Sequence, residues 1–310
     1  MEDIALHLHF DHKVLFPYCY LDEELESKDG SEDDYLYFVL LGDKKRIIDV
    51  SRENEIIVAI VHNETSNSFI SYYLSFQDGC DNIRNCEIVD SGCALEFTYT
   101  TGETGKLPMY RIPEYSMVQD CSLDKYEVLY IGKSGTGRQS LYDRLVKHET
   151  ISRISRDMHK TYPSKELYLL VTGLESSHAF HGTSPERMEQ IFRERKLGSN
   201  NADPHARHNE EKGIAEALLI KLFKPKYNFH YSNNRPLDRS EYFVRNSGHE
   251  IDSITLSIDL HFYDGSYIGL FTDQAAIEEG AAQVHYSESS SGERGNIWIE
   301  AIPQELFDLF

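Results

Sequence analysis

Short runs of apolar residues separated by polar clusters dominate the first third of the chain. Runs rich in aromatic and branched residues occupy positions 35–41, 56–61 and 69–76, and positions 4–10 alternate in part. Such runs, bounded by turn-like clusters, are typical of β-strands. No catalytic motif accompanies them. We therefore predict that residues 1–110 form a β-rich region.

The pattern changes to mixed α/β in the centre of the chain. Apolar spacing predicts helices at positions 141–148 and 210–223, the second ended by Pro225. A further helix is predicted from Thr150, as its N-cap, to about Lys160. The strands predicted in the same region cover residues 115–118, 127–131 and 166–171.

The last quarter of the chain returns to the β-rich pattern, with candidate strands at residues 254–262, 265–271 and 296–301. The predicted organisation is a β-rich acidic domain over residues 1–110, a central domain over residues 111–234, and a β-rich acidic region over residues 235–310. The last region could pack with the first.

Composition narrows the class of protein. Of the 310 residues, 40% are hydrophobic and 27% are charged, which is too apolar for a disordered chain. No apolar run reaches the length of a membrane span, and the acidic start lacks the features of a signal peptide, so we expect a cytoplasmic protein that does not enter membranes. The five cysteines are scattered without a CxxC pair, which favours reduced thiols over a zinc site.

Charge is distributed unevenly along the chain. The net charge is -21, but residues 115–234 contain 18 basic and 15 acidic residues, whereas the remainder contains 13 and 37. The overall charge by itself disfavours a nucleic-acid binder, but the mildly basic centre shows that the excess acid lies outside the central segment. The acidic flanks are explained most simply by solubility. They could also repel non-cognate DNA or contact a basic protein partner.

Residues suited to phosphodiester hydrolysis follow one another in the central region. Hydrolysis requires an activated water, a cation for the phosphate and stabilisation of the leaving oxygen. Residues 130–134, Tyr-Ile-Gly-Lys-Ser, end a predicted strand, and Arg144 and His148 follow at a spacing that would place them on one helix face. Glu216 stands on a later predicted helix, and residues 223–228 close the region.

This order of residues resembles the GIY-YIG nuclease superfamily over about 115 residues, a little over a third of the chain. Taken singly, each of these residues is more simply explained as an ordinary surface or helix residue, so the resemblance depends on their joint occurrence and order. It implies catalytic roles for Tyr115, Tyr130, Lys133, Arg144, His148 and Glu216, with Glu216 also the metal ligand. It further implies substrate-binding roles for Gly132, Arg138, Lys147 and Asn228.

The chain departs from the family pattern in two places. There is no literal Gly-Ile-Tyr sequence; Tyr115 is the best counterpart of the first tyrosine, and Tyr110 and Tyr126 compete with it. The loop at residues 134–140 is long and glycine-rich, and is similar to that of a divergent bacterial branch with an extended YIG turn. This loop bears on substrate specificity more than on chemistry.

The resemblance implies an α+β fold, with a small antiparallel sheet flanked by helices and embedded in the β-rich N- and C-terminal extensions. It implies an endonuclease that uses one Mg²⁺ or Mn²⁺ ion on a nucleic acid, with DNA favoured over RNA. The alternative is an inactive module that binds nucleic acid or a protein partner, and a weaker variant makes it one component of a bacterial defence complex.

Two further motifs are weaker. His205 and His208, next to Asp203, could bind a metal ion, but a polar loop explains them more simply. Gly135 and Gly137 could form a phosphate-binding turn, but the other glycines of a nucleotide-binding motif are missing.

Overall fold

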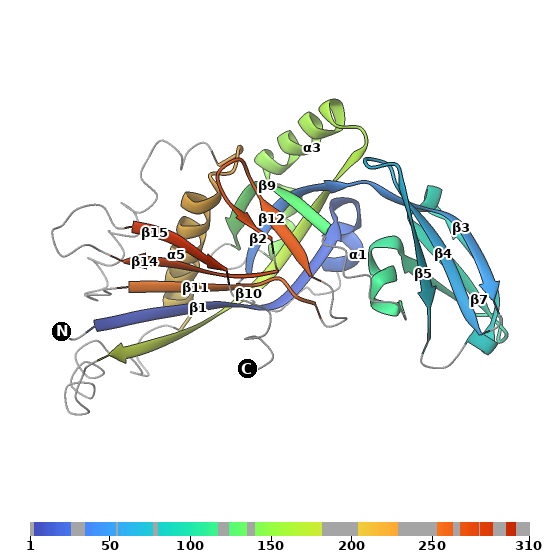
Figure 1. Cartoon of the computed structure of the whole chain (residues 1–310), viewed down its shortest axis with the longest axis horizontal. Helices are drawn as coiled ribbons and strands as arrows, with labels where there is room; N and C mark the ends of the chain where they lie inside the picture. The colour runs from blue at the N-terminus through green and yellow to red at the C-terminus, as the bar shows by residue number, and fades with distance from the viewer. Residues whose placement is uncertain are drawn as a thin grey trace.

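The computed structural model describes most of the chain, and the bounds that follow apply to that part (Figure 1). The described residues are 3–25, 35–53, 55–76, 80–116, 124–134, 140–181, 204–228, 253–262, 267–278, 280–287 and 296–301.

Nine strands of the described residues form one large sheet in the order β13-β12-β9-β2-β10-β1-β11-β14-β15. Its centre is the antiparallel trio of β9 (Asp124–Lys133), β2 (Tyr35–Asp43) and β10 (Lys165–His181). The remaining strands are β1 (Asp3–Pro17), β11 (Ser253–Asp259), β12 (Ile268–Phe271), β13 (Ala276–Ile277), β14 (Ala281–Ser287) and β15 (Asn296–Ala301). Because β1 pairs in parallel with β11, and β12 with β9, the sheet is mixed.

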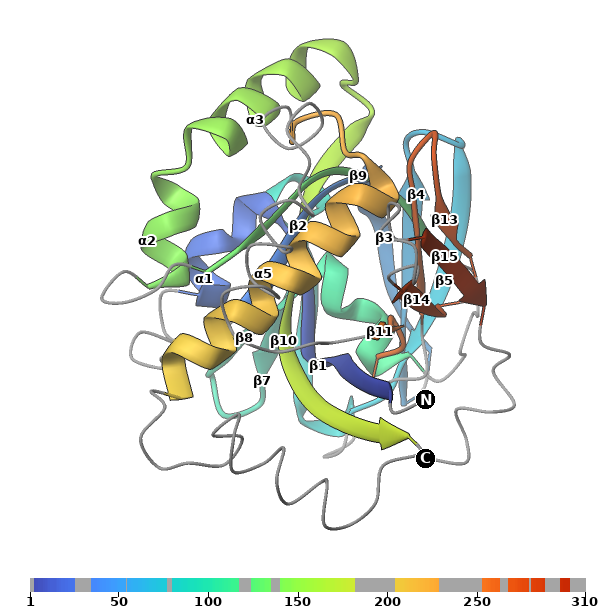
Figure 2. The ribbon, with the colours of Figure 1, turned by 90° about the vertical axis from the view of Figure 1, so that its left-hand side faces the viewer.

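The predicted fold class, a small antiparallel sheet flanked by helices, is wrong. Strands predominate, and the sheet is large and curled (Figures 1 and 2). Both free edges of the central trio are extended, because β1 pairs with β10 and β12 pairs with β9. Strands from both ends of the chain therefore complete the central sheet, which satisfies edge groups that a three-stranded sheet would leave unpaired.

An inserted module, residues 45–116, separates β2 from its neighbour β9. It contains two three-stranded antiparallel sheets and a core of its own that includes Ile57, Leu95 and Phe97 (right side of Figure 1). Its strands are β3 (Lys45–Glu53), β4 (Ile56–Asn63), β5 (Ser68–Leu74), β6 (Ile83–Val89), β7 (Ala94–Tyr99) and β8 (Thr104–Pro108), and a 3-10 helix, η5 (Met109–Tyr115), follows.

All three helices predicted in the centre of the chain are present, with bounds that differ by a few residues. The helix predicted at residues 210–223 is present as α5 and begins earlier, at Pro204 (Pro204–Phe223). The helix predicted at residues 141–148 is α2 (Leu141–Val146) and ends two residues sooner. Thr150 is not a cap, because α3 (Glu149–Thr161) begins after His148, which occupies the N-cap position. The short helix α1 (Leu21–Leu25) lies against α2.

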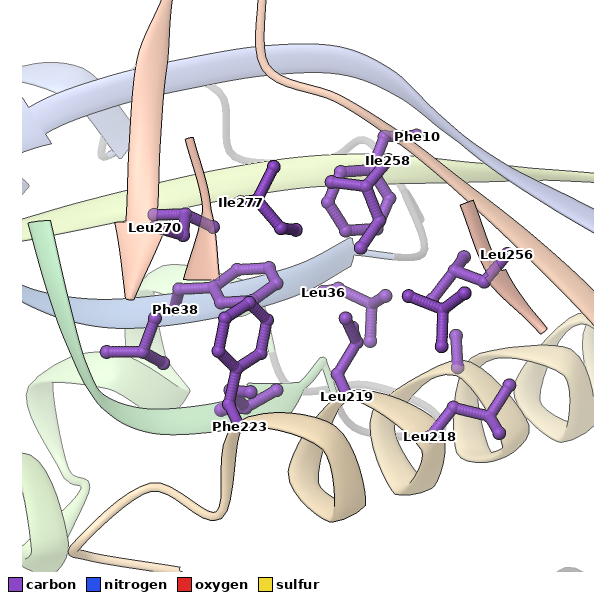
Figure 3. Packing of buried hydrophobic residues seen from close by; sticks show 14 of the residues in the cluster. Phe10, Leu36, Phe38, Leu218, Leu219, Phe223, Leu256, Ile258, Leu270 and Ile277 are labelled. Carbon is purple, nitrogen blue, oxygen red and sulfur yellow. The ribbon is translucent and has the colours of Figure 1, made fainter. Parts of the chain in front are cut away.

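Strand β2 divides the interior into two hydrophobic clusters, because successive side chains point to opposite faces of a sheet. Leu36, Phe38 and Leu40 join a cluster that includes side chains of α5. The close view shows Leu36 and Phe38 in this cluster (Figure 3). Tyr37 and Val39 join the second cluster, which includes side chains of α1, α2 and α3. Both faces of β2 are therefore buried, one against α5 and the other against α1, α2 and α3.

Helix α5 lies across the strands of the large sheet (Figure 2). It buries Leu218, Leu219 and Phe223 and carries Glu216 in the same stretch. In the described part of the chain, no helix combines the length and the apolar character that a membrane crossing requires.

Candidate active site

The candidate site is built on the pairing of β2 with β9. The register places Tyr37 opposite Gly132, and Val39 opposite Tyr130. A Cβ atom on residue 132 would lie 2.5 Å from Tyr37 Oη and 2.9 Å from a ring carbon of Tyr130. Glycine is therefore required for the two tyrosine rings, whose centroids are 6.1 Å apart, to pack beside this strand.

Tyr115 does not lie at this pairing. It ends η5 in the inserted module, where its ring centroid is 5.6 Å from that of Phe76. The competing Tyr110 hydrogen-bonds Glu24, and Tyr126 packs against Tyr168 in a hydrophobic cluster. The structure places Tyr37, which the sequence analysis did not single out, next to Tyr130.

The hydroxyl of Tyr37 lies in the interior. Tyr37 is fully buried, and its Oη has no hydrogen-bond partner among the described residues. Burial raises the pKa of Tyr37, and the nearby guanidinium of Arg144 lowers it by a smaller amount. Tyr37 therefore keeps its proton at neutral pH and can donate a hydrogen bond to a group that enters the site.

Tyr130 and His148 form a polar pair beside Tyr37. Tyr130 Oη lies 3.4 Å from His148 Nε2, and the two ring centroids are 5.3 Å apart. Burial, with the charge of Arg144, lowers the pKa of His148, so its imidazole is neutral at pH 7. Burial raises the pKa of Tyr130. The pair therefore consists of a protonated phenol and a neutral imidazole able to take a proton.

Arg144 belongs to α2 and lies close to the same groups. His148 is the N-cap of α3, so the two residues do not share one helix, although the charge of Arg144 acts on the imidazole. Arg144 Nε is buried without a hydrogen-bond partner in the described part of the chain. Burial opposes its charge, but Tyr37, Tyr130 and Glu216 together outweigh this effect and raise the pKa of Arg144. The site thus holds a permanent cation.

Glu216 enters the site from α5. It is 8% exposed, and no residue of the described segments forms a hydrogen bond or ion pair with its carboxylate. Burial raises the pKa of Glu216, whereas Lys133, Arg144 and Lys212 lower it. A carboxylate that is buried without a bound donor is costly unless a cation compensates its charge. The three cationic side chains supply part of that compensation, and a bound metal ion would add to it.

Lys212 adds a cation that sequence reasoning did not identify. It lies one helical turn before Glu216 on α5 and is fully buried, with Nζ 3.4 Å from Ser134 Oγ. Ser134 in turn accepts a hydrogen bond from the Tyr35 backbone N–H at 3.0 Å and donates its own N–H to the Tyr35 carbonyl oxygen. A lysine four residues before the glutamate was the visible signal in the sequence.

A single magnesium or manganese ion suits this set of groups. Mg²⁺ is commonly held by one or two carboxylates with water and substrate phosphate as the other ligands. Within the described residues there is no group of three or more His, Cys, Asp or Glu that could hold a metal ion. Glu216 would therefore be the protein ligand. His205 and His208 stand on α5 rather than in the polar loop that was predicted.

The side chain of Asn228 binds the backbone of β9. Its side chain is 2% exposed, accepts a hydrogen bond from the Ile131 N–H at 3.0 Å and donates one to the Ile131 carbonyl at 2.8 Å. It thereby fixes the segment after α5 to β9, one residue from Tyr130. Lys147 is exposed and pairs with Asp143 at 2.6 Å. Arg138, with Gly135 and Gly137, lies outside the described residues.

The structure therefore brings together side chains from four elements: β2, β9, α2 and α5, with His148 between α2 and α3. The residues that meet are Tyr37, Tyr130, Gly132, Lys133, Arg144, His148, Lys212 and Glu216. No family model, no curated protein and no solved structure matches the chain.

Proposed function

We propose that the chain is a metal-dependent nuclease that hydrolyses phosphodiesters, with DNA as the favoured substrate, and that its site is a divergent version of the GIY-YIG arrangement. The observation that carries the proposal is the meeting of Tyr37, Tyr130, Arg144 and Glu216 from distant parts of the chain. With Tyr37 in place of Tyr115, the two tyrosines stand on neighbouring antiparallel strands.

The cationic groups are suited to stabilise the negative charge of the phosphate in the transition state of hydrolysis. Arg144 would bind the scissile phosphate, because its planar guanidinium offers paired donors to phosphate oxygens. Lys133 and Lys212 add positive charge near Glu216. When bound at Glu216, Mg²⁺ or Mn²⁺ would supply charge to stabilise the leaving 3′ oxygen. The products would carry 5′-phosphate and 3′-hydroxyl ends.

Tyr130 and His148 could accept the proton of the attacking water in sequence. Tyr130 and Tyr37 are protonated at neutral pH because burial raises their pKa values, so neither is itself a strong base. His148 is neutral and lies 3.4 Å from the Tyr130 hydroxyl. The water would give its proton to Tyr130 Oη as the phenol proton passes to His148 Nε2, which produces the hydroxide that attacks phosphorus. Tyr37 would orient the water or a phosphate oxygen.

A binding module without catalysis is the alternative. It is favoured by the net charge of -21 and by the missing literal motif. It gives no reason for burying Glu216 among three cations, because a binder needs no metal-binding carboxylate. Loss of a single carboxylate therefore separates the two functions.

The experiment is cleavage of supercoiled plasmid DNA in Mg²⁺ or Mn²⁺ by the intact protein and by Glu216→Gln. We expect the wild type to nick the plasmid and the variant to lose cleavage by at least about two orders of magnitude. EDTA should abolish wild-type cleavage.

Glu211→Gln is the matched control. Glu211 is buried on the same helix, at 5% exposure, but its carboxylate accepts a hydrogen bond from Ser176 at 2.8 Å, and it is not among the groups that shift the pKa of Glu216. This variant should keep its activity. Equal cleavage by Glu216→Gln and the wild type would sink the one-metal assignment.

A further inference from the structure

A polar groove adjoins the candidate active site on the side of α3. It encloses about 570 Å³, a volume within the usual range for ligand sites. It is lined by Tyr130, Val146, Lys147, Glu149, Thr150, Ser152, Arg153, Arg156, Tyr227 and Asn228. Tyr130 lines the groove and lies 3.4 Å from His148 Nε2, so the groove adjoins the candidate catalytic groups at this tyrosine.

The groove is positive on a strongly acidic protein. Lys147, Arg153 and Arg156 line it together with one carboxylate, that of Glu149. Two more carboxylates lie next to the lining, because Asp143 pairs with Lys147 at 2.6 Å and Asp157 accepts a hydrogen bond from Tyr227. Arg153 and Arg156 contribute the other two cations of the lining. Both arginines are exposed on α3, which runs along the outside of the molecule (Figure 2). In a chain with a net charge of -21, this concentration of cations beside the site favours an anionic ligand.

An aromatic side chain, that of Tyr227, forms part of the groove lining. Tyr227 is 6% exposed, and its hydroxyl donates a hydrogen bond to Asp157 at 3.0 Å. Arg153 and Lys226 lie over its ring at 5.6 and 5.7 Å from the centroid. This arrangement positions the Arg153 guanidinium at the groove.

Arg156 is available to a ligand. It lines the groove, and no residue of the described segments forms a hydrogen bond or ion pair with it. Thr150 and Ser152 add hydroxyl groups, which donate to phosphate and sugar oxygens in protein–DNA contacts. A phosphate chain would satisfy these donors together.

We propose that this groove binds the sugar–phosphate backbone of the DNA strand next to the scissile phosphate, with Arg153 and Arg156 contacting successive phosphates. The inference deepens the proposed function and rests on it for the identity of the ligand. In this proposal, α3 positions the DNA strand, and the groups around Glu216 cleave it.

The test measures binding separately from cleavage. A fluorescent DNA oligonucleotide, as a single strand and as a duplex, is titrated with the full-length protein carrying Glu216→Gln, in Ca²⁺ and over a series of salt concentrations. Arg153→Glu and Arg156→Glu should each weaken binding about tenfold, and each should lower the salt slope by roughly one. The arm with the larger loss tells whether the bound strand is single or paired.

Lys160→Glu is the matched control. Lys160 is exposed on the same helix but does not line the groove, so the charge change is equal and the place differs. If both arginine variants bind like Lys160→Glu while the parent protein binds well, the groove proposal is overturned.

Plasmid cleavage by the otherwise wild-type protein distinguishes the two proposals. Loss of binding in the arginine variants without any wild-type cleavage would uphold the groove and reject the nuclease. Normal wild-type cleavage, with no loss of DNA binding in the arginine variants, would uphold the nuclease and reject the groove. A parent protein that binds neither DNA form would overturn the groove.

Discussion

At the scale of single residues, the candidate site depends on the environments that burial creates. Tyr37, His148 and Glu216 are ordinary residue types, and their chemistry follows from removal from water beside Arg144. Tyr130, Gly132, Arg144 and Glu216 were singled out from the sequence, in the order that the GIY-YIG resemblance implies. Tyr37 was not, because its partner strand follows in the chain only after the inserted module.

The pH dependence of cleavage tests the role of His148. If neutral His148 accepts the proton, activity rises with pH through its pKa, which lies below the ordinary value of 6.5 because the group is buried beside Arg144. The acid limb of the kcat/KM profile should therefore lie below pH 6.5. His148→Ala should remove this limb and lower the rate by about two to four orders of magnitude. An unchanged limb in the variant would assign the base elsewhere.

At the scale of elements, some features were predictable and others were not. Helical spacing and Pro225 located the end of α5 correctly, because these are local signals. Apolar spacing predicted one helix that extends to His148, but α2 ends at Val146 and His148 is the N-cap of α3. Periodicity alone did not show this break between the two helices. Strand runs of the flanks were visible, but their partners were not, because pairing between distant strands leaves no local signal.

Asn228 provides a prediction at this scale. Asn228→Ala would leave the buried N–H and C=O of Ile131 without partners, at a cost of about 2–4 kcal/mol in the free energy of unfolding. Urea denaturation measures this loss. A variant of full stability with weaker DNA binding would instead give Asn228 the substrate-binding role that the motif resemblance implied.

At the scale of the whole molecule, the large sheet unites segments from both ends of the chain around the central trio. The inserted module has its own hydrophobic core and meets the large sheet through contacts such as Arg46 with Glu166 at 3.1 Å and Lys45 with Asp124 at 2.5 Å. These contacts do not include the candidate catalytic residues. We infer that the module is a separate structural unit placed between two strands of the site.

Replacement of residues 45–116 by a short turn tests this organisation. Strands β2 and β9 are already antiparallel neighbours, so a turn could connect them directly. We expect the shortened protein to retain its helix content by circular dichroism and most of its cleavage activity. A folded but inactive product would show that the module contributes to catalysis.

The central claim is that Tyr37, rather than Tyr115, works with Tyr130 at the catalytic centre. The most direct measurement compares DNA cleavage by Tyr37→Phe and Tyr115→Phe under identical Mg²⁺ conditions. Each variant removes one hydroxyl and keeps the ring, so packing is preserved in both. The account predicts a loss of about tenfold or more for Tyr37→Phe, and near-normal cleavage for Tyr115→Phe. The reverse order of effects, or a wild type that cuts neither DNA nor RNA, would contradict it.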